Sequence, residues 1–221
     1  ITLKTEEQNE IERILFELSK KVRVNISELF AGHDVLTECG IIFAKAEYAK
    51  HNDAYRPSIN GTGKICLLGA RHPLISAEKV VPVDIKLDDK RLLVISGPNT
   101  GGKTVALKTV GLFALMTASG IFIPTEEGSE MCIFDDIYCD IGDSQSIAQS
   151  LSTFSAHITN LSYIMSNMKS ASLVLLDEVG DGTDPEEGAA LAIAIIKKII
   201  EKGAVGVVTT HFNSVKEFAV A

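Results

Sequence analysis

The sequence predicts a three-layer α/β fold with a largely parallel sheet over residues 54–221. A glycine-rich loop at 97–104 stands between an apolar strand and a helix. A second apolar strand, at 172–176, ends in two carboxylates, and strands then alternate with helices towards the end of the chain. Such alternation is typical of parallel sheets whose strands are connected through helices on the sheet faces.

The chain begins with helical patterns rather than with strands. Apolar residues recur on one face of a helix over 5–23, and a second helical pattern starts at Asp34. We expect two antiparallel helices over residues 1–53, forming the end of a larger helical part or a connector. The pattern changes near residue 53, where we place the domain boundary.

Three strands are expected before the glycine-rich loop. They cover residues 64–68, 79–85 and 91–96. The last of them is a short apolar run of the kind that forms a buried parallel strand. The residues that follow the loop, 105–116, are compatible with a helix and contain no proline. Strand, glycine-rich loop and helix therefore follow one another in the expected order.

The loop reads G-P-N-T-G-G-K-T and fits the phosphate-loop pattern G-x-x-x-x-G-K-[ST] at every fixed position. Its glycines allow successive backbone N–H groups to point at phosphate oxygens. Lys103 would reach the outer phosphates, and the Thr104 hydroxyl would bind Mg²⁺. A chance glycine turn is the alternative, and the flanking strand and helix count against it. The candidate nucleotide-binding segment consists of Gly97, Pro98, Asn99, Thr100, Gly101, Gly102, Lys103 and Thr104.

A second signal comes directly after the apolar strand 172–176, where Asp177 precedes Glu178. An acidic residue at the end of such a strand binds Mg²⁺ in nucleotide hydrolases. An adjacent glutamate can orient and deprotonate the attacking water. An ordinary strand entering a loop is the alternative, which weakens when a full phosphate loop lies in the same chain. We therefore expect Asp177 to be a metal ligand and Glu178 to be the general base.

The last long helix has clear signals at both ends. Asp184 can cap its start, Glu187 completes a capping box, and Gly203 stops it. The strand 204–208 follows and leads to His211. Ligands of open α/β sheets bind outside the carboxyl ends of strands, so His211 can sense the outermost phosphate or orient a water. The alternative is an ordinary surface or core histidine.

A hydroxyl-rich run at 150–155 heads a helical stretch that extends through Met165. Its hydroxyl groups can cap the free N–H groups of the helix, or the helix N-terminus can be offered to a phosphate. From the residues alone, the capping interpretation is favoured. Asp140, Asp143 and Gln145 precede the run, and their spacing does not decide between loop carboxylates and a metal-sensing loop.

The composition argues against several classes of protein. The net charge of −8 disfavours a main nucleic-acid-binding surface, which needs clustered Lys and Arg. No apolar run approaches the ~18 residues of a membrane span, and the N-terminal residues are amphipathic rather than a secretory signal. The four cysteines lack paired C-x-x-C spacing and are interpreted as reduced thiols of a cytosolic protein. Because the chain starts at Ile1 without methionine, we expect a fragment of a longer protein.

These motifs resemble the MutS family of ATPases, a branch of the ABC-type P-loop superfamily. The resemblance covers about residues 55–221 and depends on short strings: Arg71-His72-Pro73, G-P-N-T-G-G-K-T, Ser152-Thr153-Phe154, Leu175 to Glu178, Gly182-Thr183 and Thr209-Thr210-His211. The chain looks closer to the second bacterial branch, the recombination-suppressing, Smr-containing paralogue, than to mismatch-repair MutS. Thr100 and Thr104 stand where mismatch-repair members typically carry Met and Ser, and residues 140–154 look like the paralogue's pattern.

The resemblance implies an ATPase that uses ATP and Mg²⁺ and works as a homodimer with two composite sites. Ser152 would belong to a signature loop that reaches the γ-phosphate bound by the other subunit. Together with Glu178, it would be catalytic, and His211 would be the switch histidine. Asn99 would face the nucleotide. Adenine would pack just upstream of the phosphate loop, where Val81 is the candidate.

For the whole protein, the resemblance implies a lever ending within residues 1–53 that joins the ATPase domain, residues 54–221, to a DNA-embracing clamp outside this chain. An Smr nuclease domain would lie after residue 221. The branch is linked to suppression of homologous recombination on branched DNA and to binding of collided ribosomes. The expected location is the bacterial cytosol or nucleoid, without a membrane.

Three other interpretations remain open. A mismatch-repair MutS or another ABC-type DNA repair machine would use similar motifs. However, chromosome-organising ATPases usually place a long coiled coil between the phosphate loop and the acidic strand, and the gap from Thr104 to Asp177 is too short for one. A domain that binds nucleotide only to assemble would not need Glu178. A transporter subunit would carry a glycine-rich signature in place of Leu151 to Phe154.

Overall fold

The structure is a computed structural model that describes residues 2–97, 102–142 and 150–220, without the side chains of 150–154. Contacts divide the chain into two units, Ile1–Tyr48 and Ala49–Ala221. The first unit is helical and the second is α/β. Within the described residues, no helix combines the length and the apolar composition that a membrane span requires.

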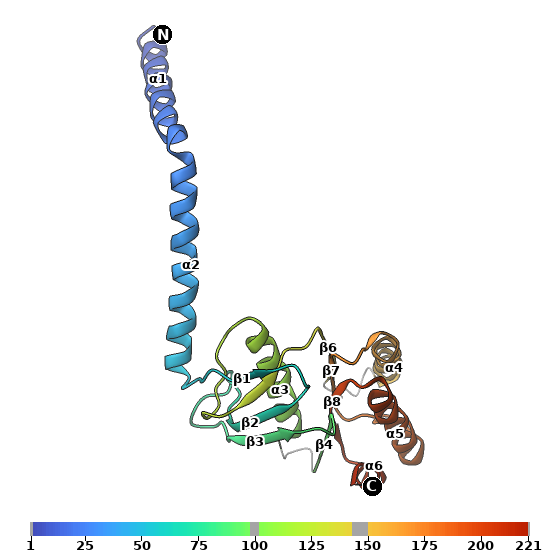
Figure 1. Ribbon diagram of the computed structural model, residues 1–221. Coiled ribbons are helices and arrows are strands. Elements are labelled where there is room, and N and C mark those ends of the chain that lie inside the picture. The colour runs from blue at the N-terminus through green and yellow to red at the C-terminus, as the bar shows by residue number, and fades with distance from the viewer. Residues whose placement is uncertain (1, 98–101, 143–149, 221) are drawn as a thin grey trace. The chain divides into compact units, whose positions relative to one another are not determined.

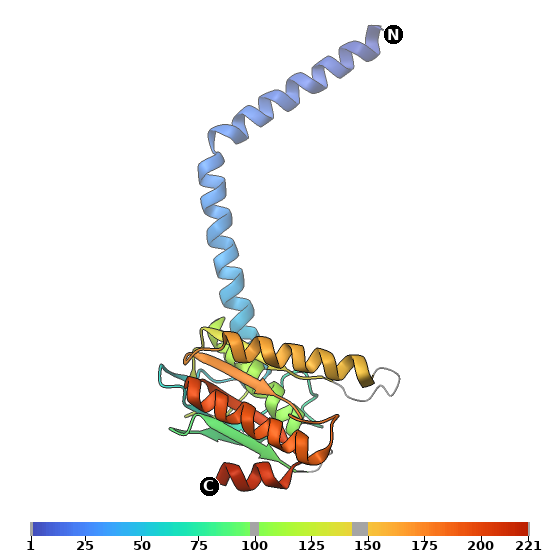
Figure 2. The ribbon, with the colours of Figure 1, turned by 90° about the vertical axis from the view of Figure 1, so that its right-hand side faces the viewer.

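The first unit consists of α1 (Thr2–Val24) and most of α2 (Ile26–His51), with only Asn25 between them. The Asn25 backbone N donates to Val22 O over 3.0 Å, so the link continues directly from the end of α1. The expected antiparallel pair is wrong, because such a pair needs a loop of about two to five residues. The two helices instead follow one another end to end (Figures 1 and 2).

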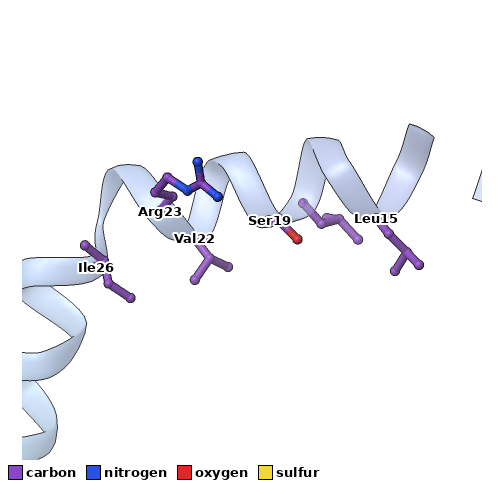
Figure 3. A pocket seen from close by; sticks show the side chains of 6 residues that line it. Leu15, Ser19, Val22, Arg23 and Ile26 are labelled. Atoms are coloured by element: carbon purple, nitrogen blue, oxygen red, sulfur yellow. The ribbon is translucent and has the colours of Figure 1, made fainter. Parts of the chain in front are cut away.

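The apolar stripe of α1 is exposed. No residue of α1 or α2 in the described part is buried, and Ile14 and Leu18 are 45% and 52% exposed. Where the two helices join, a shallow hollow is lined by Leu15, Leu18, Ser19, Val22, Arg23 and Ile26 (Figure 3). Because packing of an apolar face supplies most of a helix's stability, this unit gains little from its own contacts.

A small mixed sheet opens the second unit. It consists, in this order, of β1 (Ser58–Asn60), β5 (Glu130–Cys132), β2 (Ile65–Ala70) and β3 (Val83–Leu87). β2 is antiparallel to both neighbours. The strand expected over 79–85 begins only at Val83, because the chain turns beforehand and Lys79 N donates to Ser76 O over 2.9 Å. The sequence did not predict β1 or β5, nor that these strands form a sheet of their own.

The second sheet is parallel throughout its described strands. Its order is β4 (Leu92–Ser96), β8 (Val205–Thr210), β7 (Ser172–Leu176) and β6 (Asp136–Asp140). Every residue of β7 and β8 is buried, which suits interior strands covered on both faces. The predicted α/β fold is therefore confirmed, with a parallel sheet beside a mixed one that holds the strands expected over 64–68 and 79–85. The sequence does not predict β6, because this strand begins and ends with aspartate and is not a continuous apolar run; its Cys139 is exposed.

Helices cover both faces of the parallel sheet (Figures 1 and 2). α3 (Lys103–Ala118) contacts β7 and β8 on one side and β5 on the other, so it lies between the two sheets. Gly111 permits this approach, since an added Cβ would lie 2.5 Å from Leu175 Cδ1. α4 (Ser150–Asn167) and α5 (Pro185–Lys202) cover the opposite face, and α6 (Asn213–Val220) packs on α5. Ile164, Leu176 and Ile196 lie in the core of that layer.

Two of the signals predicted for the ends of α5 are confirmed, whereas the Glu187 carboxylate of the predicted capping box accepts from the Thr183 hydroxyl over 3.4 Å. Asp184 caps the helix, because its carboxylate accepts a hydrogen bond from Glu186 N over 3.0 Å. Gly203 ends it with a φ of 69°, in the left-handed region that glycine adopts without strain. These two local signals fix where α5 starts and stops, and thereby where β8 begins.

Candidate nucleotide-binding site

The described ends of the glycine-rich loop are Gly97, after β4, and Gly102, before α3. Gly102 has a φ of 77°, a left-handed conformation that favours glycine. The N–H groups in the first turn of a helix lack partners inside it and form the positive end of the helix dipole, so they attract anions. The remaining loop residues, Pro98, Asn99, Thr100 and Gly101, lie outside the described part of the chain.

Lys103 is the first residue of α3 and is only 4% exposed. Its Nζ donates to the carbonyl oxygen of Gly97 over 2.5 Å, so the ammonium group reaches from one end of the loop to the other. A buried ammonium is stable only with oxygen partners. Phosphate oxygens within the loop would be strong additional acceptors. Thr104 follows in the same turn and is half-buried.

The parallel register brings the ends of four strands to one edge of the sheet. Ser96 of β4 is paired with Thr210 of β8, and Asp140 of β6 is paired with Leu176 of β7. The residues that directly follow these strands are Gly97, His211, Ile141 and Asp177. Gly97, which begins the glycine-rich loop, the acidic pair and the histidine therefore share the carboxyl edge, where open α/β sheets bind ligands.

Thr209 connects the acidic pair to β8. Its hydroxyl donates to Asp177 Oδ1 over 2.5 Å and accepts from Glu178 N over 2.8 Å. The residue is fully buried, so the hydroxyl is used both as donor and as acceptor away from water. In the sequence, Thr209 belongs to the Thr209-Thr210-His211 motif but has no role predicted for its own side chain. Its role follows from its position in β8, and it can be recognised only when β8 is known to lie beside β7.

Glu178 has a φ of +47°, which is uncommon for a residue with a side chain. Such conformations cost about 1–3 kcal/mol and persist where the surroundings determine them. Here the backbone is held on both sides. Its N–H donates to Thr209 Oγ1, and its carbonyl oxygen accepts from Asp181 N over 3.0 Å. The residue is thus fixed in one backbone conformation beside Asp177.

The loop after Glu178 packs backbone against backbone on α5. Gly180 has a φ of +87°, and an added Cβ would lie 2.2 Å from Gly188 O. Asp181 Oδ1 accepts from Gly182 N over 2.8 Å, which closes the next turn. Residues 182–184 follow directly after these fixed contacts. They are the residues for which the family resemblance implies a crossing between subunits.

His211 follows β8 and is exposed. Its ring packs on the ring of Phe212, with centroids 4.2 Å apart and planes tilted by 42°. Phe212 is buried, and its N–H donates to Thr210 Oγ1 over 3.1 Å. A core residue therefore supports the imidazole at the carboxyl edge while the ring stays accessible.

Asp140, at the end of β6, is joined to both α4 and β7. Its carboxylate contacts His157 Nδ1 at 3.0 Å and accepts from Asn160 Nδ2 over 2.8 Å. Its carbonyl oxygen accepts from Asp177 N over 2.9 Å. Sequence reasoning left Asp140 undecided and did not single out His157 or Asn160. Asp143 and Gln145 lie outside the described residues.

The roles of all the predicted site residues, Ser152 and Val81 included, stay predictions. Ser152 lies near the start of α4, which begins at Ser150, and its side chain is outside the described part. Val81 is 81% exposed just before β3. In the same upstream segment, burial and, to a lesser extent, the charge of Lys108 lower the pKa of His72.

The donors predicted for a cation are the Thr104 hydroxyl and the Asp177 carboxylate. Both are oxygen donors, which Mg²⁺ prefers. Within the described residues, no group of three or more His, Cys, Asp or Glu gathers to hold a metal. Because Mg²⁺ usually keeps several waters and binds together with substrate phosphates, these sparse donors suit a Mg²⁺ ion that binds with a nucleotide.

Comparison with known proteins adds a family to this geometry. The family model described as MutS domain V matches residues 93–220. Endonuclease MutS2 of Caldicellulosiruptor bescii is 56% identical over 218 residues, which is 98% of this chain and 28% of that protein. The proteins of the same name from Finegoldia magna and Shouchella clausii are 54% and 51% identical, with the same coverage. The chain thus spans about a quarter of the length of the curated relatives it matches, 28%.

Proposed function

The chain belongs to the MutS family and is of the MutS2 type, and on this premise we propose that it is the ATP-binding, ATP-hydrolysing and dimerising motor of a DNA-binding protein. The observation that carries the proposal is the shared edge of the parallel sheet. There the chain from Gly97 to Lys103 follows β4, and Asp177 and Glu178 follow β7, with β8 between the two strands.

The proposed nucleotide site uses the loop and α3 for the phosphates. Lys103 and the N–H groups at the start of α3 hold the phosphate oxygens. Thr104 and Asp177 hold Mg²⁺, which neutralises phosphate charge when it is bound. The oxygen chemistry of both donors and the orientation of Asp177 by the Thr209 hydroxyl support this assignment.

Glu178 is the proposed general base, which orients the attacking water and takes its proton. Its fixed backbone conformation supports this role, because strained residues cluster at sites where geometry matters. His211, on the same edge, is proposed to contact the outermost phosphate. Val81 is proposed to pack on the adenine, with an aliphatic side chain in place of a stacking ring.

MutS family proteins bind DNA and dimerise. We propose that two copies of this chain form composite sites, in which Ser152 of one copy reaches the γ-phosphate held by the other. The loop that includes residues 182–184 would cross between the subunits. The tight packing of Gly180 on Gly188 gives that loop a rigid base on α5, which supports this role.

For the whole protein, we propose that residues 1–53 end a lever and that residues 54–221 are the motor that it connects to a DNA clamp. The relatives are named endonucleases, and we assign any nuclease activity to residues outside this chain. We also propose suppression of homologous recombination and contact with ribosomes, in the bacterial cytosol. The similarity to Endonuclease MutS2 proteins favours this branch over mismatch-repair MutS.

The test measures binding of a fluorescent ATP analogue and release of phosphate from Mg-ATP. We expect Lys103→Ala to abolish nucleotide binding, and Glu178→Gln to bind nucleotide but not hydrolyse it. Lys90→Ala, at an exposed turn, is the matched lysine control and should behave as wild type. Normal nucleotide affinity in Lys103→Ala would contradict the phosphate-loop assignment. Normal hydrolysis in Glu178→Gln would contradict the assignment of the base.

A further inference from the structure

α4 is fastened to the sheet edge by two polar side chains. His157 and Asn160 are three residues apart and therefore share one face of the helix. Both reach the Asp140 carboxylate, at 3.0 Å from His157 Nδ1 and 2.8 Å from Asn160 Nδ2. The carboxylate only accepts, so the imidazole contributes Nδ1–H. Asn160 also donates to Cys139 O over 3.1 Å, so α4 is joined to the last two residues of β6.

One edge of the half-exposed His157 ring lies close to the backbone at Gly142. An added Cβ on Gly142 would lie 2.9 Å from His157 Cε1 and 3.3 Å from Nε2. The ring therefore lies against the chain just after β6, and its Nδ1 faces Asp140. Hydrogen bonds have preferred directions, whereas apolar packing has none, so this contact fixes how far α4 is shifted along its own axis.

The same aspartate contacts the proposed metal ligand through its backbone. The carbonyl oxygen of Asp140 accepts from Asp177 N over 2.9 Å. A displacement of α4 therefore acts on Asp140 and, through one peptide, on Asp177. In the other direction, Ser152 lies five residues before His157, which is about 7.5 Å along a helix axis. Fixing α4 at His157 and Asn160 thus also fixes where the helix starts.

We propose that His157 and Asn160 are positioning residues for ATP hydrolysis, which act by holding the start of α4 and the Asp177 peptide in one fixed relationship through Asp140. This inference rests on the proposed ATPase function and adds a physical connection between the two parts of the composite site. An alternative is that the contact only stabilises the fold. The apolar core under α4, which includes Leu161 and Ile164, already provides that stability.

Variants of the full 221-residue chain separate these roles. His157→Leu removes the hydrogen bond, whereas His157→Asn keeps an amide donor two bonds from Cβ, at the place of Nδ1. Asn160→Leu breaks the second contact. Asn167→Leu is its matched control, because the Asn167 amide donates within α4, to Tyr163 O over 2.8 Å. Each variant is measured for affinity to a fluorescent ATP analogue, for kcat per bound nucleotide, and for Tm.

We expect His157→Leu and Asn160→Leu to lower kcat about ten- to a hundredfold and to leave nucleotide affinity within about twofold. His157→Asn should recover most of the loss, and Asn167→Leu should match wild type. Amide hydrogen exchange adds a direct measure, because the Asp177 N–H should exchange faster when its acceptor residue is no longer held. If His157→Leu does not fold, Asn160→Leu tests the same prediction through the other contact.

The inference is overturned if His157→Leu lowers Tm but keeps the wild-type kcat per bound nucleotide, because the contact is then only structural. It is also overturned if His157→Asn is as slow as His157→Leu, because the hydrogen bond is then irrelevant. In both cases the wild type still hydrolyses ATP, so the proposed function stands. A wild-type chain that binds no ATP overturns the proposed function, and this inference with it, before any variant is compared.

Discussion

Thr209 and Asp177 are joined side chain to side chain by a hydrogen bond of 2.5 Å between neighbouring strands of the parallel sheet. The same hydroxyl accepts the N–H of Glu178 over 2.8 Å. One buried side chain of β8 thus orients the proposed metal ligand and fixes the peptide that begins the proposed general base. The geometry of the acidic pair therefore depends on β8 as much as on β7.

Replacing Thr209 by valine keeps the shape of the side chain and removes both hydrogen bonds. We expect the free energy of unfolding to fall by about 1–3 kcal/mol, because the amide of Glu178 loses its partner. ATP turnover should fall at least about tenfold, because Asp177 is no longer oriented. Denaturant unfolding and phosphate release measure the two effects. Thr209→Ser keeps the hydroxyl and should preserve turnover; equal turnover in the valine and serine variants would refute the orienting role.

Glu178 combines a strained backbone with a proposed chemical role, and two substitutions separate them. Glu178→Gln retains the strain and removes the base, so stability should stay near wild type while hydrolysis is lost. The left-handed backbone conformation of Glu178 costs about 1–2 kcal/mol, and Glu178→Gly removes this cost. Glycine also makes the unfolded chain more flexible, which offsets part of the gain in stability. We expect the glycine variant to be at least as stable as wild type in urea and equally inactive. A marked loss of stability would show that the φ of +47° is not strained.

Blocking hydrolysis should trap the ATP-bound assembly. We expect Glu178→Gln to shift from monomer to dimer in light scattering when Mg-ATP is saturating, and not with Mg-ADP. The physical reason is that the γ-phosphate is the proposed meeting point of the two subunits. Glu178→Gln combined with Lys103→Ala is the control and should stay monomeric. A monomer with ATP demonstrably bound would argue against a dimer formed by this chain alone.

Ser152 acts on the partner's nucleotide in the proposed dimer. Ser152→Ala should therefore lower turnover and leave nucleotide binding by the monomer intact. Ser162→Ala, at an exposed position further along α4, is the matched control. Binding by fluorescence and turnover by phosphate release are compared for both. Equal loss of binding and turnover in Ser152→Ala would make the hydroxyl structural.

Burial, and secondarily the charge of Lys108, lower the pKa of His72. At a pH somewhat below the ordinary value of 6.5, the unfolded chain binds a proton there that the folded chain does not. The free energy of unfolding should therefore decrease as the pH falls below 6.5 and level off below the folded pKa. Urea unfolding over a series of pH values measures the slope. His72→Gln should flatten it and Lys108→Gln should weaken it; an unchanged slope in His72→Gln contradicts the assignment.

The predictions that the structure confirms depend on short stretches of adjacent residues. The apolar run of β4, the start of α3 at Lys103 and the cap at Asp184 are each specified by a few adjacent residues, and the structure has them where the sequence indicates. The parallel sheet follows from the alternation of strands and helices. The edge shared by Asp177 and His211 follows in turn, because parallel strands end on the same side.

Contacts between distant residues explain what the sequence did not reveal. β1 and β5 have only three residues each, too few for a periodic pattern, and they exist because they pair with each other. The sequence predicts antiparallel helices because its second helical pattern starts at Asp34, whereas α2 begins at Ile26. The roles of Thr209 and Asp140 depend on which strands are neighbours, and that order cannot be read from any one segment.

β7 serves two purposes within five residues. All its side chains from Ser172 to Leu176 are buried in the core, and the next residue is Asp177. A methyl group added to or removed from this strand would shift both the packing and the carboxylate that follows. Substitutions in β7 are therefore limited both by core packing and by the position of Asp177. Substitutions intended to raise the Tm are better made at other positions. The exposed residues in the last two turns of α5, such as Lys197 and Glu201, offer such positions, because they lie at the end of the helix that is away from the carboxyl edge of the sheet.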